Sequence, residues 1–285
     1  MSSATIQPKP HTSSPDGIEQ PDRPMLFAGP CVIESRNQLF ETAQVLRDVA
    51  EAAGFTFVFK ASFDKANRSS ISAWRGPGIE AGLELLGDLR ASLDIRTLCD
   101  IHEPTQAALA ADVVDVLQIP AFLCRQTDLL LAAAATGKPV NLKKGQFMAP
   151  WQVGPAVEKL RSKGSSEILL TERGTTFGHG DLIVDFRGLS ELRNTDCPCL
   201  FDASHSAQQP GIHGDRSGGK RRWTPILARA AAAAGFDGLY LEVHPDPDSA
   251  LSDRDTQWPL SEVAPLLEHF KAPFDSCRDL PRLPY

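Results

Sequence analysis

The chain has 285 residues, and its 29 lysines and arginines stand against 36 aspartates and glutamates, a formal net charge of −7. Nucleic-acid and membrane-surface proteins draw their affinity from basic patches, so we expect neither kind of partner. No apolar run approaches the roughly 18 residues that span a bilayer, and residues 1–24 lack the apolar segment of an export signal. The six cysteines are therefore expected to be reduced thiols of a cytoplasmic protein.

The composition predicts one central domain between two tails. Residues 1–24 contain five prolines and almost no large apolar side chain, which predicts a disordered N-terminal tail. Residues 273–285, from Pro273 onward, are similar and are predicted to form a C-terminal tail. Residues 25–272 remain, and their number is usual for a single (β/α)8 barrel.

Short apolar runs recur through residues 25–272, and segments with helical spacing, such as Leu39, Ala43 and Leu46, lie between them. The runs are nearly continuous, as expected for parallel strands that are covered on both faces. Eight repeats of strand and helix predict an α/β fold, a closed (β/α)8 TIM barrel, with an open doubly wound sheet as the alternative. The predicted strands are Met25–Ala28, Thr56–Phe59, Ile95–Leu98, Val113–Ile119, Pro139–Leu142, Glu167–Leu170, Cys199–Phe201 and Leu239–Leu241.

Reactive side chains end or follow these predicted strands. Parallel strands bring their carboxyl ends to one rim, where barrel enzymes hold their active sites. One polar residue after one strand means little because loops are hydrated, but so varied a set after eight strands predicts a site. The set comprises Cys31, Glu34, Lys60, Asp100, His102, Gln118, Lys143, Lys144, Glu172, Arg173, Asp202, His205, Glu242 and His244.

A group of cations is expected to converge at this rim. Closely packed cations repel one another unless an anion shares the site, and arginine donates paired hydrogen bonds to phosphate or carboxylate. The group therefore predicts a receptor for two or more such anionic groups. Lys60 and Lys65, which flank Asp64, could each pair with a local aspartate or glutamate instead. The cations are Lys60, Lys65, Arg68, Arg125, Lys143 and Arg173.

Cys31, His205, Glu242 and Asp253 form a second predicted group. A thiolate, an imidazole and carboxylates suit one divalent metal ion such as zinc, iron(II) or manganese. The four residues are far apart in the sequence, so only the closed barrel would assemble them. Taken singly, a cysteine like Cys31 is more often a small buried apolar residue than a ligand.

Other suggestive features receive no functional assignment. Cys197 and Cys199 lack the second half of a zinc clip and fall where a strand enters the barrel. The basic run 220–222 is interpreted as a loop or a solvated helix start. His179 and His213 lie in glycine-rich loops, and the sequence assigns them no role.

Four segments resemble the 3-deoxy-D-manno-octulosonate 8-phosphate synthases: Phe59–Ser70, Pro120–Asp128, Asn141–Phe147 and Glu242–Pro247. The resemblance covers about residues 25–272. The Lys-Ala-Asn-Arg-Ser-Ser stretch within the first segment is specific, because the related enzymes of aromatic biosynthesis carry a Lys-Pro-Arg-Thr type of sequence there.

The sequence Gly29-Pro30-Cys31 resembles the metal-dependent branch of these synthases, since the metal-independent branch has asparagine at the cysteine position. The resemblance implies a transferase, usually a homotetramer, with one divalent metal ion. Such an enzyme condenses phosphoenolpyruvate with D-arabinose 5-phosphate and water. It releases phosphate and the eight-carbon sugar acid phosphate that is used for lipopolysaccharide.

The resemblance also implies roles for individual residues. Lys65, Lys143, Arg173 and His205 would be catalytic, and Arg68 would hold the arabinose phosphate together with Ser69. The implied metal ligands are Cys31, His205, Glu242 and Asp253. The implied substrate-binding residues are Lys60, Lys65, Asn67, Arg68, Ser69, Asp100, Gln118, Pro120, Ala121, Arg125, Lys143, Arg173 and His205.

Two alternatives remain open from the residues alone. Lys60 or Lys143 could form a Schiff base in a class I aldolase. A barrel with the same rim could also be a sensor of sugar phosphate or metal without catalysis, since a fold does not determine a function.

Overall fold

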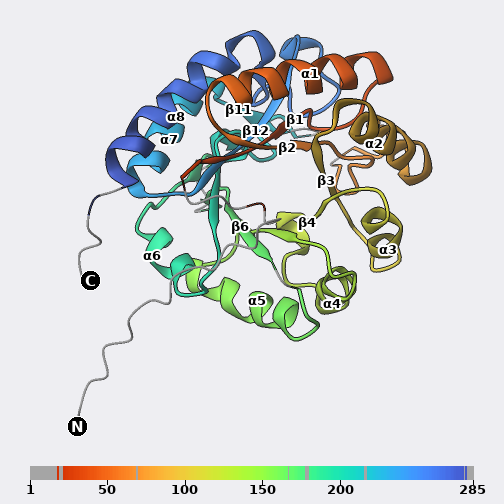
Figure 1. Cartoon of the computed structure of the whole chain (residues 1–285), viewed down its shortest axis with the longest axis horizontal. Helices are drawn as coiled ribbons and strands as arrows, with labels where there is room; N and C mark the ends of the chain where they lie inside the picture. The colour runs from red at the N-terminus through yellow and green to blue at the C-terminus, as the bar shows by residue number, and fades with distance from the viewer. Residues whose placement is uncertain are drawn as a thin grey trace.

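The computed structural model describes residue 18 and residues 22–68, 70–165, 167–176, 180–214, 217–278 and 280. Within this part of the chain, parallel strands form one closed ring and helices surround it (Figure 1). The first strand of the ring pairs with the last, Met25 opposite Gly238 and Gly29 opposite Glu242, which closes the sheet. The (β/α)8 barrel predicted from the sequence is therefore confirmed, and the open sheet is excluded.

Each predicted strand has a counterpart in the ring, shifted by at most a few residues. The strand order β1-β2-β3-β4-β5-β6-β9-β12 follows the chain, as in any barrel built from successive strand–helix units. The bounds are β1 Met25–Gly29, β2 Thr56–Lys60, β3 Arg96–Asp100, β4 Val116–Ile119, β5 Val140–Lys143, β6 Ile168–Glu172, β9 Cys199–Asp202 and β12 Gly238–His244.

The helices bury one apolar face each against the outside of the ring. In α1, the residues Leu39, Ala43 and Leu46 are buried at the predicted spacing, and the Ser35 hydroxyl caps the helix by accepting a hydrogen bond from the amide of Gln38. The bounds are α1 Arg36–Ala52, α2 Ile79–Leu93, α3 Gln106–Ala111, α4 Thr127–Ala135, α5 Gly154–Arg161, α6 Gly188–Arg193, α7 Thr224–Ala234 and α8 Val263–Arg278. None of the helices in the described residues is long and apolar enough to cross a membrane.

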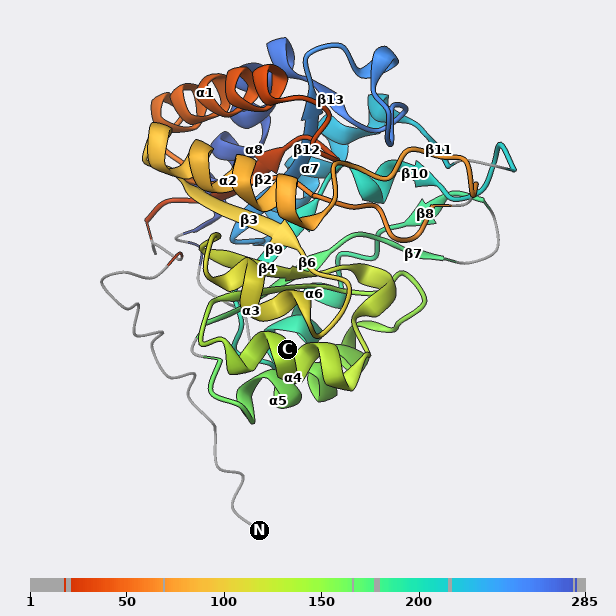
Figure 2. The ribbon, with the colours of Figure 1, turned by 90° about the vertical axis from the view of Figure 1, so that its right-hand side faces the viewer.

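Short elements gather beyond the carboxyl ends of the strands. Two antiparallel hairpins, β7 with β8 and β10 with β11, lie together on this side (Figure 2). The short strands are β7 Thr175–Thr176, β8 Leu182–Ile183, β10 Gln208–Gln209, β11 Gly218–Gly219 and β13 Trp258–Pro259. The 3-10 turns are η1 Ala121–Leu123, η2 Pro150–Val153, η3 His205–Ala207, η4 Arg221–Trp223, η5 Pro247–Ser249 and η6 Leu260–Glu262.

The structure departs from the predicted tails at both ends. Ile18, inside the segment predicted to be disordered, is only 2% exposed and packs with the apolar residues inside the ring, and its amide donates to Glu167 Oε1 at 2.8 Å. Helix α8 continues past Pro273 to Arg278. Proline removes one helical hydrogen bond, but the ring of Phe274 stacks on that of Phe270 and keeps this turn against the core. The rest of residues 1–21 and residues 281–285 lie outside the described part.

Candidate active site

The carboxyl ends of the barrel strands surround a cavity of about 480 Å³. Most of the residues that the sequence assigned to substrate or metal lie in its wall, although they come from strands and loops far apart in the chain. Those in the wall are Lys65, Asn67, Arg68, Asp100, Gln118, Pro120, Ala121, Lys143, Arg173, His205, Glu242 and Asp253.

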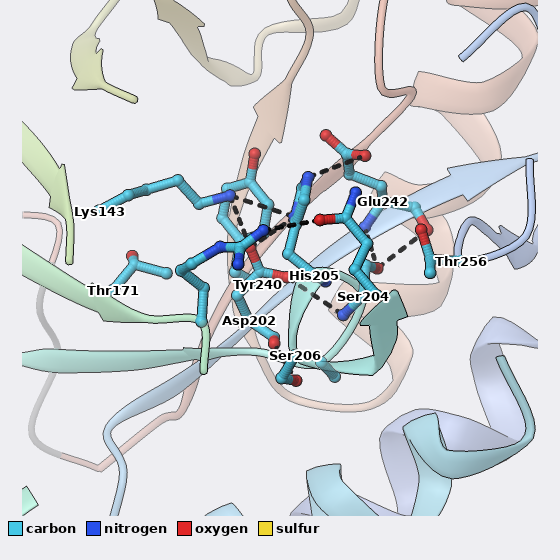
Figure 3. Close-up of polar contacts among 12 residues, drawn as sticks. Lys143, Thr171, Asp202, Ser204, His205, Ser206, Tyr240, Glu242 and Thr256 are labelled. Atoms are coloured by element: carbon cyan, nitrogen blue, oxygen red, sulfur yellow. Dashed lines mark hydrogen bonds and ion pairs between the residues drawn. The ribbon is translucent and has the colours of Figure 1, made fainter. Parts of the chain in front are cut away.

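Lys143, Asp202 and His205 form a buried charged group at one side of the cavity (Figure 3). Lys143 Nζ lies 2.5 Å from Asp202 Oδ2 and 3.7 Å from the centre of the Tyr240 ring. Burial alone would raise the pKa of Asp202, but His205 and Lys143 hold it well below its ordinary range. Asp202 therefore stays ionised and holds Lys143 over the cavity as a cation.

The orientation of His205 follows from the same carboxylate. His205 Nδ1 lies 2.7 Å from Asp202 Oδ2 and donates to it, because an ionised carboxylate only accepts. Nε2 then faces the opposite way, at 3.6 Å from Glu242 Oε2 and 3.7 Å from Asp253 Oδ2. A histidine whose Nδ1 proton is held by a carboxylate is the usual arrangement for metal ligation through Nε2.

A thiol and two carboxylates complete this group. Ligand atoms of Cys31, Glu242 and Asp253 all lie within 4.8 Å of one another. Cys31 Sγ lies 3.3 Å from Asp253 Oδ2 and 2.9 Å from Ser252 Oγ. The local chain fits this position closely, because a Cβ at Gly29 would overlap the carbonyl oxygen of Lys60.

The donor set fits a divalent metal ion. Glu242 Oε2 is buried and has no hydrogen-bond partner among the described residues, although a buried carboxylate oxygen normally has one. Burial, with Glu242 next in importance, raises the pKa of the Cys31 thiol well above its ordinary value. A bound cation would reverse this effect and stabilise the thiolate. Cys31, His205, Glu242 and Asp253 would be its ligands.

Lys60 lies beneath the cavity rather than in its wall. Its side chain is 1% exposed, and Nζ donates to the carbonyl oxygens of Pro30 and Cys31 and to Glu242 Oε1, the last at 2.5 Å. Burial would raise the pKa of Glu242, but Lys60 and His205 lower it to about 2. The structure thus gives Lys60 the position of a support for Cys31 and Glu242, which differs from the substrate contact that we predicted.

Lys65 stands between two carboxylates. Its Nζ lies 3.9 Å from both Asp100 Oδ2 and Glu242 Oε1 and donates to Ser62 Oγ at 3.1 Å. The alternative that Lys65 pairs with Asp64 is wrong, because Asp64 forms an ion pair with Arg75 outside the cavity. Lys65 thus lies in the wall of the cavity, within reach of an anion there, and its own partners are Asp100 and Glu242.

Arg173 carries an unused donor on the other side of the cavity. Its Nη2 donates to Gln208 Oε1 at 2.7 Å, and Gln208 in turn donates to Asp253 Oδ1 at 3.1 Å. Arg173 Nη1 and the nearby Gln146 Oε1 are buried, line the cavity and have no hydrogen-bond partner among the described residues. Unpaired buried polar atoms of this kind indicate a place for a polar ligand.

Arg68 reaches across the mouth of the cavity to the loop that carries Asp253. Its Nη1 donates to Ser252 Oγ at 2.9 Å and its Nη2 to the carbonyl oxygen of Leu251 at 3.2 Å. Ser252 Oγ also contacts Cys31 Sγ, so one hydroxyl joins the loop residue Arg68 to the predicted metal site.

Arg125 does not join the other cations. The turn η1 directs Cys124 into the core at 1% exposure, and the next side chain, Arg125, is exposed and does not line the cavity. Ser69 and His179 lie outside the described residues. His213 Nε2 is 3.8 Å from Asp255 Oδ2 on the hairpin side of the mouth.

Several residues that line the cavity or support its wall were given no role from the sequence. Tyr240 and Gln146 sit within apolar or glycine-containing runs that give no sign of a polar role. Asp202 and His102 did follow predicted strands, and that position was the signal that could have identified them. Gln208 could not have been found, because the hairpin that places it has no sequence signature.

The fold and the site together define an enzyme of the (β/α)8 barrel class, with its chemistry at the carboxyl end of the strands. A family model described as the DAHP synthetase I family matches residues 12–272, and the chain belongs to this family. A protein of Nitratidesulfovibrio vulgaris strain DP4 is 55% identical over 250 residues, which cover 88% of this chain and 92% of the relative. It is named 2-dehydro-3-deoxyphosphooctonate aldolase.

Two further relatives carry the same name. A protein of Xylella fastidiosa strain M12 is 52% identical over 252 residues, which cover 88% of this chain and 91% of the relative. A protein of Coxiella burnetii strain Dugway 5J108-111 is 52% identical over 246 residues, which cover 86% of this chain and 88% of the relative.

Proposed function

We propose that this protein condenses phosphoenolpyruvate with D-arabinose 5-phosphate and water to form 3-deoxy-D-manno-octulosonate 8-phosphate and phosphate, a step of Kdo and lipopolysaccharide synthesis. The observation that carries the proposal is the cavity in which Lys65, Lys143 and Arg173 converge above Asp202 and Glu242. The shared name of relatives that are 54% and 55% identical over 250 residues supports it.

The cations would orient two anionic substrates. The enol carbon of phosphoenolpyruvate is a weak nucleophile, so orientation carries much of the catalysis, and alignment of two reactants can lower a barrier by roughly 7–11 kcal/mol. C3 of phosphoenolpyruvate attacks the sugar aldehyde while water adds to C2, and the resulting tetrahedral intermediate expels phosphate. Lys143 and Arg173 stabilise the charge that grows on this leaving group.

Asp202 organises the two basic side chains of this wall, Lys143 and His205. Burial would lower the pKa of His205, but Asp202 raises it above the ordinary value. Burial lowers the pKa of Lys143, an effect that Asp202 and Glu242 oppose. The carboxylate of Asp202 thus holds Lys143 as a cation on one side and, on the other, accepts the Nδ1 proton of His205, whose Nε2 is left for the metal ion.

We propose further that the enzyme belongs to the metal-dependent branch and holds one divalent ion on Cys31, His205, Glu242 and Asp253. A bound divalent ion supplies Lewis acidity toward an oxygen ligand or a more acidic water. The supporting observations are the unpaired Glu242 Oε2 and the Nε2 of His205 that faces Glu242 and Asp253. A cytoplasmic location and a homotetramer are also part of this proposal.

Phosphate release tests the activity. We expect release when phosphoenolpyruvate and D-arabinose 5-phosphate are supplied together and none when either is supplied alone. A sensor without catalysis would bind a substrate and release no phosphate. Borohydride should trap no sugar on Lys60 or Lys143, since the reaction needs no Schiff base; a trapped adduct would support the aldolase alternative.

Metal content tests the branch. Elemental analysis of freshly purified protein should give about one divalent ion per chain, and chelation should abolish turnover until a divalent ion is returned. The Cys31→Ala variant should lose both the bound ion and the response to added metal. A Cys31→Ala enzyme with full activity that still responds to metal would contradict this ligand assignment.

A further inference from the structure

A chain of buried amides and hydroxyls crosses the interior of the barrel below the cavity. The Thr171 hydroxyl donates to Asn141 Oδ1 at 2.8 Å, and Asn141 Nδ2 donates to Gln118 Oε1 at 2.7 Å. Gln118 Nε2 then donates to Asp100 Oδ1 at 2.5 Å. The chain thus connects β6, β5, β4 and β3 in order.

The direction of this chain follows from its last member. Burial alone would raise the pKa of Asp100, but Lys65 and Lys60 hold it well below its ordinary range, so Asp100 only accepts hydrogen bonds. Gln118 must turn its amide nitrogen toward Asp100, and its oxygen therefore faces Asn141. Asn141 is fixed in the same way, and its oxygen requires the donor that Thr171 supplies.

Only one end of the chain reaches the cavity. Asp100 and Gln118 line it, whereas Asn141 and Thr171 are 0% exposed and do not. Ser62 donates to the second oxygen of Asp100, and the second proton of Gln118 Nε2 meets the Tyr240 hydroxyl oxygen at 3.2 Å. These bonds fix the plane of the Asp100 carboxylate and leave it directed at whatever occupies the cavity.

We infer that Thr171 and Asn141 are positioning residues for the sugar phosphate: they lock Gln118 in the one orientation that holds Asp100 ready to accept a sugar hydroxyl. The inference rests on the proposed function, which supplies the hydroxyl-bearing substrate. Loss of the Thr171 hydroxyl frees Asn141 to rotate, Gln118 can follow, and the Gln118 oxygen then repels Asp100. Phosphoenolpyruvate has no hydroxyl group, so its binding should not change.

A comparison of two nearly isosteric variants tests this inference. Thr171→Val removes the hydroxyl and Thr171→Ser keeps it. Calorimetric titration with D-arabinose 5-phosphate should show an affinity about tenfold lower for Thr171→Val, and close to wild type for Thr171→Ser. The KM for D-arabinose 5-phosphate should rise by the same factor, while the KM for phosphoenolpyruvate stays within about twofold.

Asn141→Asp gives a second arm in case Thr171→Val folds poorly. A carboxylate at 141 attracts the Gln118 amide nitrogen away from Asp100 and should weaken sugar phosphate binding at least as much. Thr56→Val is the matched control, since Thr56 is a buried strand residue whose hydroxyl has no hydrogen-bond partner in the described part of the chain. This control should bind the sugar phosphate like wild type.

Three results would overturn the inference: equal changes in both KM values, a lower melting temperature with unchanged sugar phosphate affinity, or no recovery in Thr171→Ser. Wild-type protein that binds the sugar phosphate but releases no phosphate would refute the proposed function alone, because the affinity ratio still measures the effect of Thr171. Wild-type protein that binds no sugar phosphate would refute both.

Discussion

The interior of the barrel has two layers built on the same strands. The lower layer consists of apolar side chains such as Val58, Leu98 and Leu200, and the upper layer of charged ones such as Lys60, Asp100 and Asp202. On β3 the buried Leu98 is followed two residues later by Asp100, and on β9 Leu200 is followed by Asp202. The lower layer is an apolar cluster that also includes Ile18. Side chains on one face of a strand repeat every two residues, so the next inward-facing position after the apolar layer already lies in the charged site.

This difference indicates which layer stabilises the fold and which layer carries the chemistry. The apolar layer and the helix-facing core stabilise the fold by removing apolar surface from water. The upper layer buries charges such as Lys60 with Glu242 and Lys143 with Asp202, whose pairing mainly offsets the cost of their own desolvation. Substitutions in the upper layer should therefore mainly lower activity, and substitutions in the lower layer should mainly lower the free energy of unfolding.

The largest effect is expected in the upper layer. Lys143→Met should lower kcat about 10²- to 10³-fold, because it removes the cation that we propose stabilises the leaving phosphate. Phosphate release under saturating substrates measures it. Lys138→Met, at the opposite end of the β5 segment, is the control and should keep kcat. A Lys143→Met enzyme with near-normal kcat would contradict the proposal that the upper layer takes part in the reaction.

The reverse test concerns the lower layer. Leu200 is 0% exposed, and Leu200→Ala should lower the free energy of unfolding by about 2–5 kcal/mol, since a cavity replaces packed atoms. Urea denaturation gives this value. Both KM values of the folded enzyme should stay unchanged; if either moves strongly, the two layers are not separable.

Arg68, in a loop above the upper layer, is expected to act on one substrate only. Arg68→Ala should raise the KM for D-arabinose 5-phosphate by about 10- to 100-fold, because the proposed charge-assisted hydrogen bond to its phosphate is lost, with little change for phosphoenolpyruvate. Initial-rate kinetics with each substrate varied in turn measure this split. Arg36→Ala, whose guanidinium pairs with Asp88 on the helical shell, should change neither KM. Equal effects of Arg68→Ala on both substrates would refute its assignment to the sugar phosphate.

The smallest effect is expected at the Asp64–Arg75 pair, outside both layers. Burial would raise the pKa of Asp64, but Arg75 lowers it below the ordinary value. The ionised pair thus stabilises the fold above the pKa of Asp64 in the unfolded chain, about 4, and loses this contribution as the pH falls below it. Asp64→Asn should melt about 2 °C or less below wild type at pH 7. The difference should shrink toward pH 3; one that grows would contradict this account.

The sequence predicted the strands of the ring and most of the cavity wall, for a physical reason. Buried parallel strands require continuous apolar runs, and barrel closure sends whatever ends them, such as Lys143 or Asp100, to the same rim. The direction in which each side chain points within that rim could not be predicted from the sequence. Lys60 ends its strand like Lys143 but points beneath the cavity, and Arg125 points away from it because the turn η1 directs its neighbour inward.

The ends of the domain also could not be predicted from the sequence. Proline-rich composition marked Pro273 as the start of a tail, but ring stacking by Phe274, a tertiary contact, carries α8 to Arg278. In the same way Ile18 is one apolar residue within a polar segment, and its burial depends on contacts with the cluster inside the ring and with Glu167, which are far from it in the sequence.

Closure through β1 and β12 has a consequence for the connectivity of the polypeptide. Arg278, at the end of α8, donates from Nη1 to the carbonyl oxygen of Asp22 at 3.2 Å, so the start and finish of the barrel are neighbours. A short peptide could join them, and new termini could be opened in the turn at Gly137, remote from the cavity. A circularly permuted chain should assemble the same rim, since the ring depends on which strands lie side by side and not on which is synthesised first.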